Sequence, residues 1–256
     1  MKALLAFMKK EWMEAIRSGK LVFLIILFTL FGIMNPAIAK LTPWLMKQMS
    51  SQLAESGMII TSVKVDALTS WTQFFKNLPI GLIVFAIMFS SSFTKEYQSG
   101  TMQLLITKGL SRFKIIIAKT SIMILLWSLC YWICYFVTFF YNSFYWDNSI
   151  ANNLVNAAIM WWLFGLWILC LIVLFSTVSN SSGAVMAGTF GIVVVSYIME
   201  MFPGIKEYVP TFLMKSSNIV IGMSDAGQYT NSIIIVCGMM VICFLASILL
   251  INKKKI

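Results

Sequence analysis

Acidic and basic side chains gather in one short stretch of this chain, residues 94–119, which lies between two long apolar runs. The stretch carries Glu96 and also an internal apolar stripe that a solvated loop would not need. Charges of both signs at the edges of an apolar contact can make charge-assisted hydrogen bonds to another surface. That chemistry is recognition of a partner. The basic residues of the stretch are Lys95, Lys108, Arg112, Lys114 and Lys119.

The residues that most catalytic and energy-coupling sites need do not occur in the sequence. It has no histidine, which excludes a histidine-based triad and the usual zinc sites. It has no G-x-x-x-x-G-K-[ST] loop to hold a nucleotide phosphate, and no pair of acids deep in an apolar run. We therefore expect no catalytic residue, metal ligand or cofactor in this chain, and expect its energy to come from a partner.

Composition places these charges in a membrane protein. Sixty per cent of the residues are apolar and 11% are charged, whereas a soluble domain is about half apolar and a quarter charged. A transmembrane helix needs about 20 apolar residues, and six stretches come close to or exceed that length. We predict an all-α, polytopic protein with a single transmembrane domain over residues 1–256. The predicted spans are residues 21–39, 78–93, 115–139, 154–176, 183–201 and 232–251.

The charge distribution orients these spans. The net charge is +10, and 13 of the 19 lysines and arginines fall on one side of the six-span arrangement. Lysine and arginine concentrate on the cytoplasmic side, so we expect both termini and the charged stretch to be cytoplasmic. Such a basic surface attracts anionic membrane lipid, and its distribution argues against nucleic acid as a partner. The outer segments hold Lys40, Lys47, Lys64, Lys76, Lys206 and Lys215.

Residues 3–18 precede the first span and have helical periodicity. Apolar residues recur there at intervals of three and four, which predicts an amphipathic helix lying in the inner membrane interface. The alternative is an ordinary basic flank that only fixes orientation. The recurring residues are Leu5, Met8, Trp12 and Ile16.

Several features within the spans suggest packing. The five cysteines all fall in apolar runs, and we expect them to be buried free thiols. Asn35 and Pro36 should kink or loosen the first span. Gly183, Ala187 and Gly191 recur every four residues, which allows close helix approach. Their spacing does not decide between packing within the subunit and a dimer seam.

Glu200 lies at the outer end of the fifth predicted span. An acid at membrane depth is a functional candidate by default. Two lysines, Lys206 and Lys215, are close in sequence, and we favour a structural ion pair or an interfacial carboxylate.

The charged stretch follows a particular residue order: Glu96, then Gly100-Thr101, Leu104-Leu105, Ser111-Arg112 and Lys119. With six spans and a basic amphipathic N-terminal helix, this order resembles the type-2 ABC transporter permeases. The chain departs from the family at Lys108-Gly109, where a proline often precedes the Ser-Arg pair, although glycine also ends helices. The motif covers about 25 residues, and the topology covers the whole chain.

The resemblance implies that residues 94–114 form a coupling segment that docks into a separate cytoplasmic ATP-binding subunit. That subunit would bind ATP and Mg²⁺. Independently, Thr101 is a usable N-cap, and Leu105 belongs to an apolar face that a cleft can bury. The alternative is a loop that holds its apolar residues in lipid. The predicted docking residues are Glu96, Gly100, Thr101, Leu105, Ser111 and Arg112.

The resemblance also implies a second permease, identical or paralogous, and a pathway at the dimer seam formed largely by the second and fifth spans. The alternative for each lining residue is internal packing or contact with lipid. The chain has 18 methionines and 20 phenylalanines, which favour an adaptable apolar cavity and an apolar or amphipathic cargo such as a peptide, antimicrobial, drug or lipid. The candidate lining residues are Phe85, Met88, Phe89, Val194 and Tyr197.

Together these expectations describe the membrane subunit of an ATP-driven exporter in a bacterial plasma membrane, itself not an enzyme. Two alternatives stay open: a membrane interaction or immunity protein that transports nothing, and an ion-coupled secondary transporter.

Overall fold

The computed structural model describes the backbone of residues 2–55 and 65–254, and all of their side chains except those of residues 49–55. The described residues form helices and turns without a strand, and six of the helices are long and apolar enough to cross a membrane. This confirms the all-α, six-span prediction. The helices are α1 (Lys2–Arg17), α2 (Lys20–Glu55), α3 (Ala67–Gln98), α4 (Thr101–Thr107), α5 (Arg112–Tyr145), α6 (Leu154–Val178), α7 (Ser182–Glu200), α8 (Ser217–Val220) and α9 (Thr230–Lys253), and the short 3₁₀ turns are η1 (Asn148–Ile150), η2 (Lys206–Tyr208), η3 (Pro210–Ser216) and η4 (Ala226–Tyr229).

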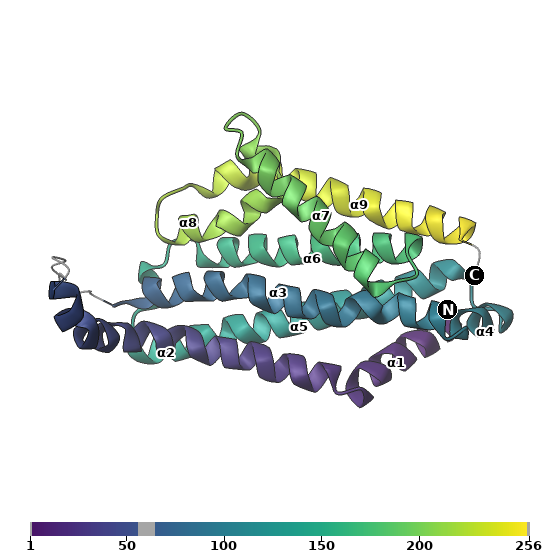
Figure 1. Ribbon diagram of the computed structural model, residues 1–256, viewed down its shortest axis with the longest axis horizontal. Coiled ribbons are helices and arrows are strands. Elements are labelled where there is room, and N and C mark those ends of the chain that lie inside the picture. The colour runs from purple at the N-terminus through teal and green to yellow at the C-terminus, as the bar shows by residue number, and fades with distance from the viewer. Residues whose placement is uncertain (1, 56–64, 255–256) are drawn as a thin grey trace.

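The first two spanning helices are longer than their predicted spans. Lys20 and Lys40 lie 20 positions apart on α2, and at 1.5 Å per residue this is about 30 Å, the thickness of a hydrocarbon core. The helix nevertheless continues to Glu55, and α3 begins at Ala67, well before the predicted start of its span. Polar residues beyond the predicted spans thus stay helical, and both helices continue at the end of the bundle that the charge distribution predicts to be outer (Figure 1).

The expected loosening at Pro36 does not end α2, which continues through Pro36 and Pro43. Prolines are tolerated in membrane helices where neighbouring groups satisfy the freed backbone. The adjacent Asn35 is fully buried, and its amide donates to Thr138 Oγ1 of α5 at 3.0 Å. Its carbonyl oxygen accepts from Asn77 Nδ2 of α3 at 2.8 Å. A buried polar contact therefore joins three spans at this position.

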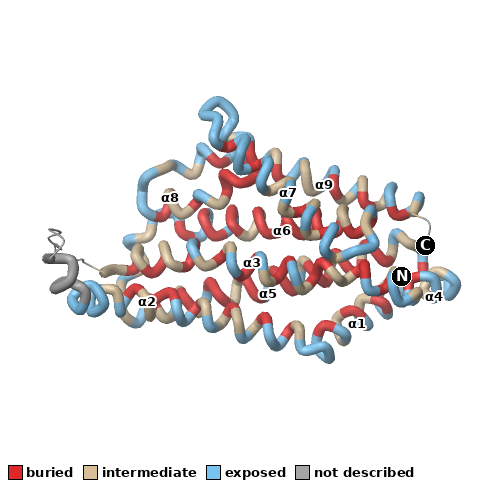
Figure 2. The backbone as a smooth tube through the Cα atoms, in the orientation of Figure 1, coloured by how far each residue is buried: buried red, intermediate tan, exposed pale blue. Residues whose placement is uncertain are grey.

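The helices are arranged in layers, with α3, α5 and α6 between α1 and α2 on one side and α7 and α9 on the other (Figure 1). In the most apolar stretch of α6, 72% of the residues are buried, whereas in the corresponding stretches of α7 and α9 only 17% are buried. Figure 2 shows the same contrast along the backbone. The two C-terminal spans thus leave most of their apolar surface uncovered by the described part of this chain.

The helices α5 and α6 approach each other very closely in the core. A Cβ atom on Gly165 of α6 would lie 2.3 Å from the indole of Trp127 on α5, so only glycine fits there. Trp127 is fully buried, and its ring meets Phe85 edge to face at 5.5 Å. This contact fixes α5 and α6 against each other, with α3 alongside.

The N-terminal helix forms as predicted, but it turns a different face toward the bundle. Its buried residues are Phe7, Glu11 and Ala15, whereas Leu5 is 62% exposed and Ile16 is also exposed. Met8 and Trp12 of the predicted apolar face are partly buried against the core, so that face packs on the bundle only in part. That α1 lies in the membrane interface stays a prediction.

Candidate coupling site

The coupling segment begins with a sharp reversal at Gly100. Its φ of 69° lies in the left-handed region that glycine adopts without strain. Gly100 ends α3, because its N–H donates to the carbonyl of Tyr97, and it occupies the N-cap position of α4. Thr101 is therefore not the N-cap, contrary to the sequence-based expectation. Its hydroxyl instead lies 2.9 Å from that of Ser99.

A second glycine, Gly109, ends the seven-residue helix α4. Its φ is 87°, its N–H donates to the carbonyl of Ile106, and the N–H of Leu110 donates to the carbonyl of Leu105. These two bonds form a Schellman motif, which satisfies the last carbonyls of a helix. Gly109 thus ends the helix where the family often has a proline. Two glycine turns hold α4 as a separate short helix at the inner end of the bundle (Figure 1).

The side chains of α4 divide into an inward and an outward group. Met102 is fully buried, and Leu105 and Ile106 are half-buried against the core. Leu104, in contrast, is 61% exposed. The residue order predicted Leu105 as the docking leucine, but Leu104 presents its side chain to the surroundings.

Five charged residues form the inner charge cluster: Lys10, Glu11 and Glu14 of α1, Glu96 of α3 and Lys119 of α5. The ammonium of Lys119 is 2.8 Å from Glu11 Oε2 and 3.2 Å from Glu96 Oε1, and its side chain is only 1% exposed. Lys10 Nζ lies 2.9 Å from Glu11 Oε1, 2.9 Å from Glu96 Oε1 and 2.8 Å from Glu14 Oε2. The cluster joins α1 to the helices that flank α4.

The acids of the cluster stabilise the charged form of Lys10. Burial acts to lower the pKa of Lys10, but hydrogen bonds to Glu14, Glu11 and Glu96 outweigh it and raise the pKa above its ordinary value. For Glu14, burial acts to raise the pKa, and the hydrogen bond from Lys10 lowers it below its ordinary value. Both groups are therefore charged at neutral pH, as an ion-paired cluster requires.

The carboxylates of this cluster do not make a metal site. Oxygens of Glu11, Glu14 and Glu96 lie within 4.8 Å of one another, a spacing that could hold a cation. Each of these carboxylates, however, already pairs with Lys10 or Lys119. The two ammonium groups occupy the position that a metal ion would need.

Arg112 was predicted to dock a partner, but it binds the end of α9. Its Nη1 donates to the carbonyls of Ile251 at 2.5 Å and Lys254 at 2.7 Å. Lys254 in turn donates to the carbonyls of Ser176 and Ser179, at the inner turn between α6 and α7. Positive groups stabilise the carbonyl end of a helix. Arg112 therefore fastens the inner end of the bundle.

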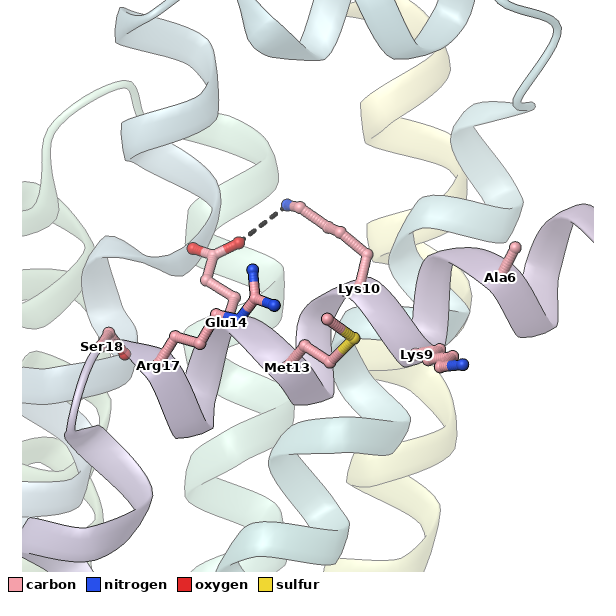
Figure 3. A pocket seen from close by; sticks show the side chains of 7 residues that line it. All are labelled: Ala6, Lys9, Lys10, Met13, Glu14, Arg17 and Ser18. Carbon is pink, nitrogen blue, oxygen red and sulfur yellow. Dashed lines mark ion pairs between the residues drawn. The ribbon is translucent and has the colours of Figure 1, made fainter.

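Two hollows border the inner charge cluster. One, of about 470 Å³, lies between α1 and α4 and is lined by residues that include Lys95, Leu104 and Lys108. The other, of about 540 Å³, runs along α1, and Figure 3 shows the Lys10–Glu14 ion pair at its edge. Both hollows share this pair. The α1 hollow is lined by Ala6, Lys9, Lys10, Met13, Glu14, Arg17 and Ser18.

The predicted pathway residues divide between two environments. Phe85 and Phe89 are buried, stacked on each other at 4.5 Å, and Phe85 also contacts Trp127. Met88 is half-buried against the same core. Val194 and Tyr197 of α7 are exposed, and they line an apolar cavity of about 220 Å³ between α3, α6, α7 and η3.

This outer cavity uses a face of α3 that the sequence did not single out. Leu82, Ile83 and Ala86 form its α3 wall, and Phe164 and Ile168 form its α6 wall. The spans are apolar all round, so their periodicity could not distinguish this face from that of Phe85.

Glu200 makes the ion pair that the sequence favoured. It is 8% exposed, and its Oε1 lies 2.6 Å from Lys215 Nζ. All five cysteines are free, and four of them are buried as expected, whereas Cys237 is exposed, contrary to the expectation.

Most of the chain matches a known family. Residues 5–256 fit the family model described as "ABC-2 family transporter protein". The chain belongs to the ABC-2 transporter family. It is therefore the membrane-spanning permease of an ABC transporter, and the family implies an ATP-binding partner subunit. The family and the six apolar helices make this permease a multi-pass membrane protein, consistent with a bacterial plasma membrane.

The permease is also similar to a protein of Bacillus subtilis (strain 168) named "Uncharacterized transmembrane protein YxlG". The two are 22% identical over an alignment of 233 residues, and the alignment covers 86% of each chain. The name of that relative, too, describes a transmembrane protein.

Sequence reasoning missed two important members of the permease's inner end. Glu11 looks like part of a solvated basic helix, yet it is 8% exposed and bound to Lys119. Leu104 was quoted in the motif but not chosen for docking. Of the six predicted docking residues, Thr101 and Ser111 are exposed, Gly100, Leu105 and Arg112 are intermediate, and Glu96 is buried.

Proposed function

We propose that this permease belongs to an ATP-driven exporter of apolar or amphipathic cargo, and that the ATP-binding subunit docks on α4. The observation that carries the proposal is the exposed Leu104 on a short helix held by two glycine turns. Burial of an exposed leucine in a partner's cleft removes apolar surface from water, which favours association. This subunit would bind the ATP and Mg²⁺ that this chain has no loop to hold.

The inner charge cluster connects the proposed docking segment to the membrane helices. Glu96 is four residues before Gly100, and it pairs with Lys10 of α1 and Lys119 of α5. A displacement of α4 would therefore move α1 and α5 with it, because these paired charges are costly to separate once buried. This supports α4 as the place where ATP-dependent movement enters the membrane helices.

The charges around α4 favour a partner surface of opposite sign. Lys95 and Lys108 border the hollow beside α4, and Lys9 and Arg17 border the hollow along α1. All four are exposed. We infer that acidic residues surround the cleft of the ATP-binding subunit, since complementary charge guides association and fixes orientation.

A second permease would cover α7. A Cβ on Gly191 would meet nothing within 4 Å, one on Gly183 would meet only the Ser181 hydroxyl at 3.7 Å, and Ala187 between them is exposed. Gly188, in contrast, packs against Phe175 of α6. One face of α7 thus packs within the subunit, and the open small-residue face is suited to close approach by another helix.

The apolar outer cavity supports the proposed cargo class. It is bordered by exposed residues of α3 and α7, Ile83, Val194 and Tyr197. It therefore opens to the outside of this subunit, on the same side as the open face of α7. An apolar lining favours an apolar part of a cargo molecule over a sugar or a free ion.

The test is co-purification of the permease with its ATP-binding subunit after co-expression, followed by native mass spectrometry. We expect the wild type to give a complex of two permeases and two ATP-binding subunits. Leu104→Asp should reduce the recovered ATP-binding subunit at least about tenfold, because a charge would enter the buried contact. Val178→Asp is the matched control, since Val178 is similarly exposed at the inner end of α6.

Two results would contradict this function. Undiminished co-purification and ATPase activity of Leu104→Asp would remove α4 as the docking element. Transport by the purified permease alone, driven by an ion gradient without ATP, would instead establish a secondary transporter.

A further inference from the structure

The Glu200 carboxylate is buried but incompletely satisfied. Its side chain is 4% exposed, and Lys215 is its one ion-pair partner among the described residues. Its Oε2 has no hydrogen-bond partner there. Lys215, in contrast, has a side chain that is 56% exposed. A buried carboxylate therefore depends on a cation that is itself mostly in solvent.

This carboxylate lies within one helical turn of a residue that lines the outer cavity. Tyr197, which lines the cavity, precedes Glu200 by three positions, and residues at this spacing are neighbours on one helix face. Met214, another lining residue, immediately precedes Lys215, and its sulfur accepts a hydrogen bond from the Tyr197 hydroxyl at 2.9 Å. Each member of the ion pair is thus close in sequence to a residue that lines the cavity.

The size of the cavity limits what enters it. Pockets that enclose a drug-sized molecule measure about 300–1,000 Å³, and this cavity measures about 220 Å³. It can hold one alkyl chain or one apolar side group while the remainder of the molecule stays outside. Three residues of helix rise about 4.5 Å, so the charged group of such a molecule would be close to its apolar group.

Replacing the cation beside Glu200 with another cation costs less free energy than removing it without replacement. A carboxylate buried without a partner is strongly disfavoured, but an incoming ammonium group would replace that of Lys215 and keep the charge compensated. Lys215 would lose little on release, because its exposed side chain can be hydrated. An anionic molecule would find no compensating gain at this carboxylate.

We propose that Glu200 and the outer cavity form a binding site for amphipathic cations, with Lys215 as an internal competitor that the cargo displaces. The proposal rests on the exporter function proposed above and specifies its cargo: a molecule with a positively charged amine next to an apolar chain or side group.

Binding is to be measured by calorimetry on the purified permease in nanodiscs of neutral lipid, without the ATP-binding subunit. Empty nanodiscs correct for partitioning into lipid. The probes share one chain and differ in head group: octylammonium, octanol and octyl sulfate. We expect octylammonium to bind the wild type about tenfold more tightly than octanol, and octyl sulfate to bind no more tightly than octanol.

Two variants should act in opposite directions. Glu200→Gln should abolish the preference for octylammonium over octanol, whereas Lys215→Gln should strengthen octylammonium binding several-fold by removing the competitor. Lys206→Gln is the control for Lys215→Gln, because Lys206 is exposed in the same outer segment and should leave binding unchanged.

A purely structural ion pair would give a different pattern, with no head-group preference in the wild type or in either variant. A cation preference that persists in Glu200→Gln, or weaker octylammonium binding in Lys215→Gln, would overturn the proposal. If Glu200→Gln does not fold, Lys215→Gln alone decides. Failure of docking at α4 would leave these binding results unaffected, so the two proposals fail separately.

Discussion

The permease buries carboxylates at both ends, and the two ends treat them differently. At the inner end, Glu11 and Glu96 share two ammonium groups, and Lys119 is nearly inaccessible. At the outer end, Glu200 depends on the exposed Lys215. The inner charges join three helices, and each of these two carboxylates would keep one cation if the other left. The outer carboxylate keeps a partner that can leave. Ion pairs of similar residues thus join helices at the inner end, whereas at the outer end they leave the cation position beside Glu200 open to exchange.

The largest effect is expected for Lys119→Met, which removes the central cation and leaves two buried carboxylates short of a partner. Breaking a buried pair in this way costs about 3–5 kcal/mol. The free energy of unfolding in detergent measures it. Lys114→Met, on the same helix and half-buried, should cost below about 0.5 kcal/mol. Equal losses in the two variants would show that the inner cluster does not hold the helices together.

A smaller effect is expected for Lys215→Gln, at the outer end. Loss of this partner leaves a single carboxylate beside the outer surface, at a cost of about 1–2 kcal/mol in the same assay. A loss as large as that of Lys119→Met would mean that the outer pair is as structural as the inner cluster. The contrast between the two ends would then disappear.

The smallest effect is expected within the inner cluster itself, for Glu14→Gln. Glu14 is exposed and pairs with Lys10 one turn away, so the loss should be below about 0.5 kcal/mol. Because Lys10 lowers the pKa of Glu14 from 4.5, its contribution is present above about pH 4.5 and is lost as the pH falls through the lowered value. The difference in unfolding free energy between wild type and variant should therefore be smaller at pH 3 than at pH 7.

The six spans could be predicted because hydropathy is a local signal, whereas the coupling role of residues 94–114 stays a prediction. Helix ends were less predictable: α2 continues to Glu55 because polar residues remain helical beyond the predicted span. The partner of Glu11 was not visible at all, since Lys119 lies 108 positions away and only the fold brings them together.

The faces of the spans were the least predictable feature. Phe85 and Ala86 are neighbours in sequence, yet Phe85 packs against Trp127 and Ala86 borders the outer cavity. In a helix that is apolar on every side, no contrast in residue type marks which side meets protein and which meets a cavity.

The contacts of Arg112 can form only late in the synthesis of the chain. The carbonyls that it binds belong to residues 139 and 142 positions later in the chain. Chains are made from the N-terminus at about 5–20 residues per second, so the Arg112 guanidinium waits seconds, at the end of the bundle predicted to be cytoplasmic, before its acceptors exist. During that interval α4 is present while the inner end of the bundle is still open. An ATP-binding subunit that arrives early meets a coupling helix whose support is incomplete, and assembly of the complex is therefore expected to follow completion of α9.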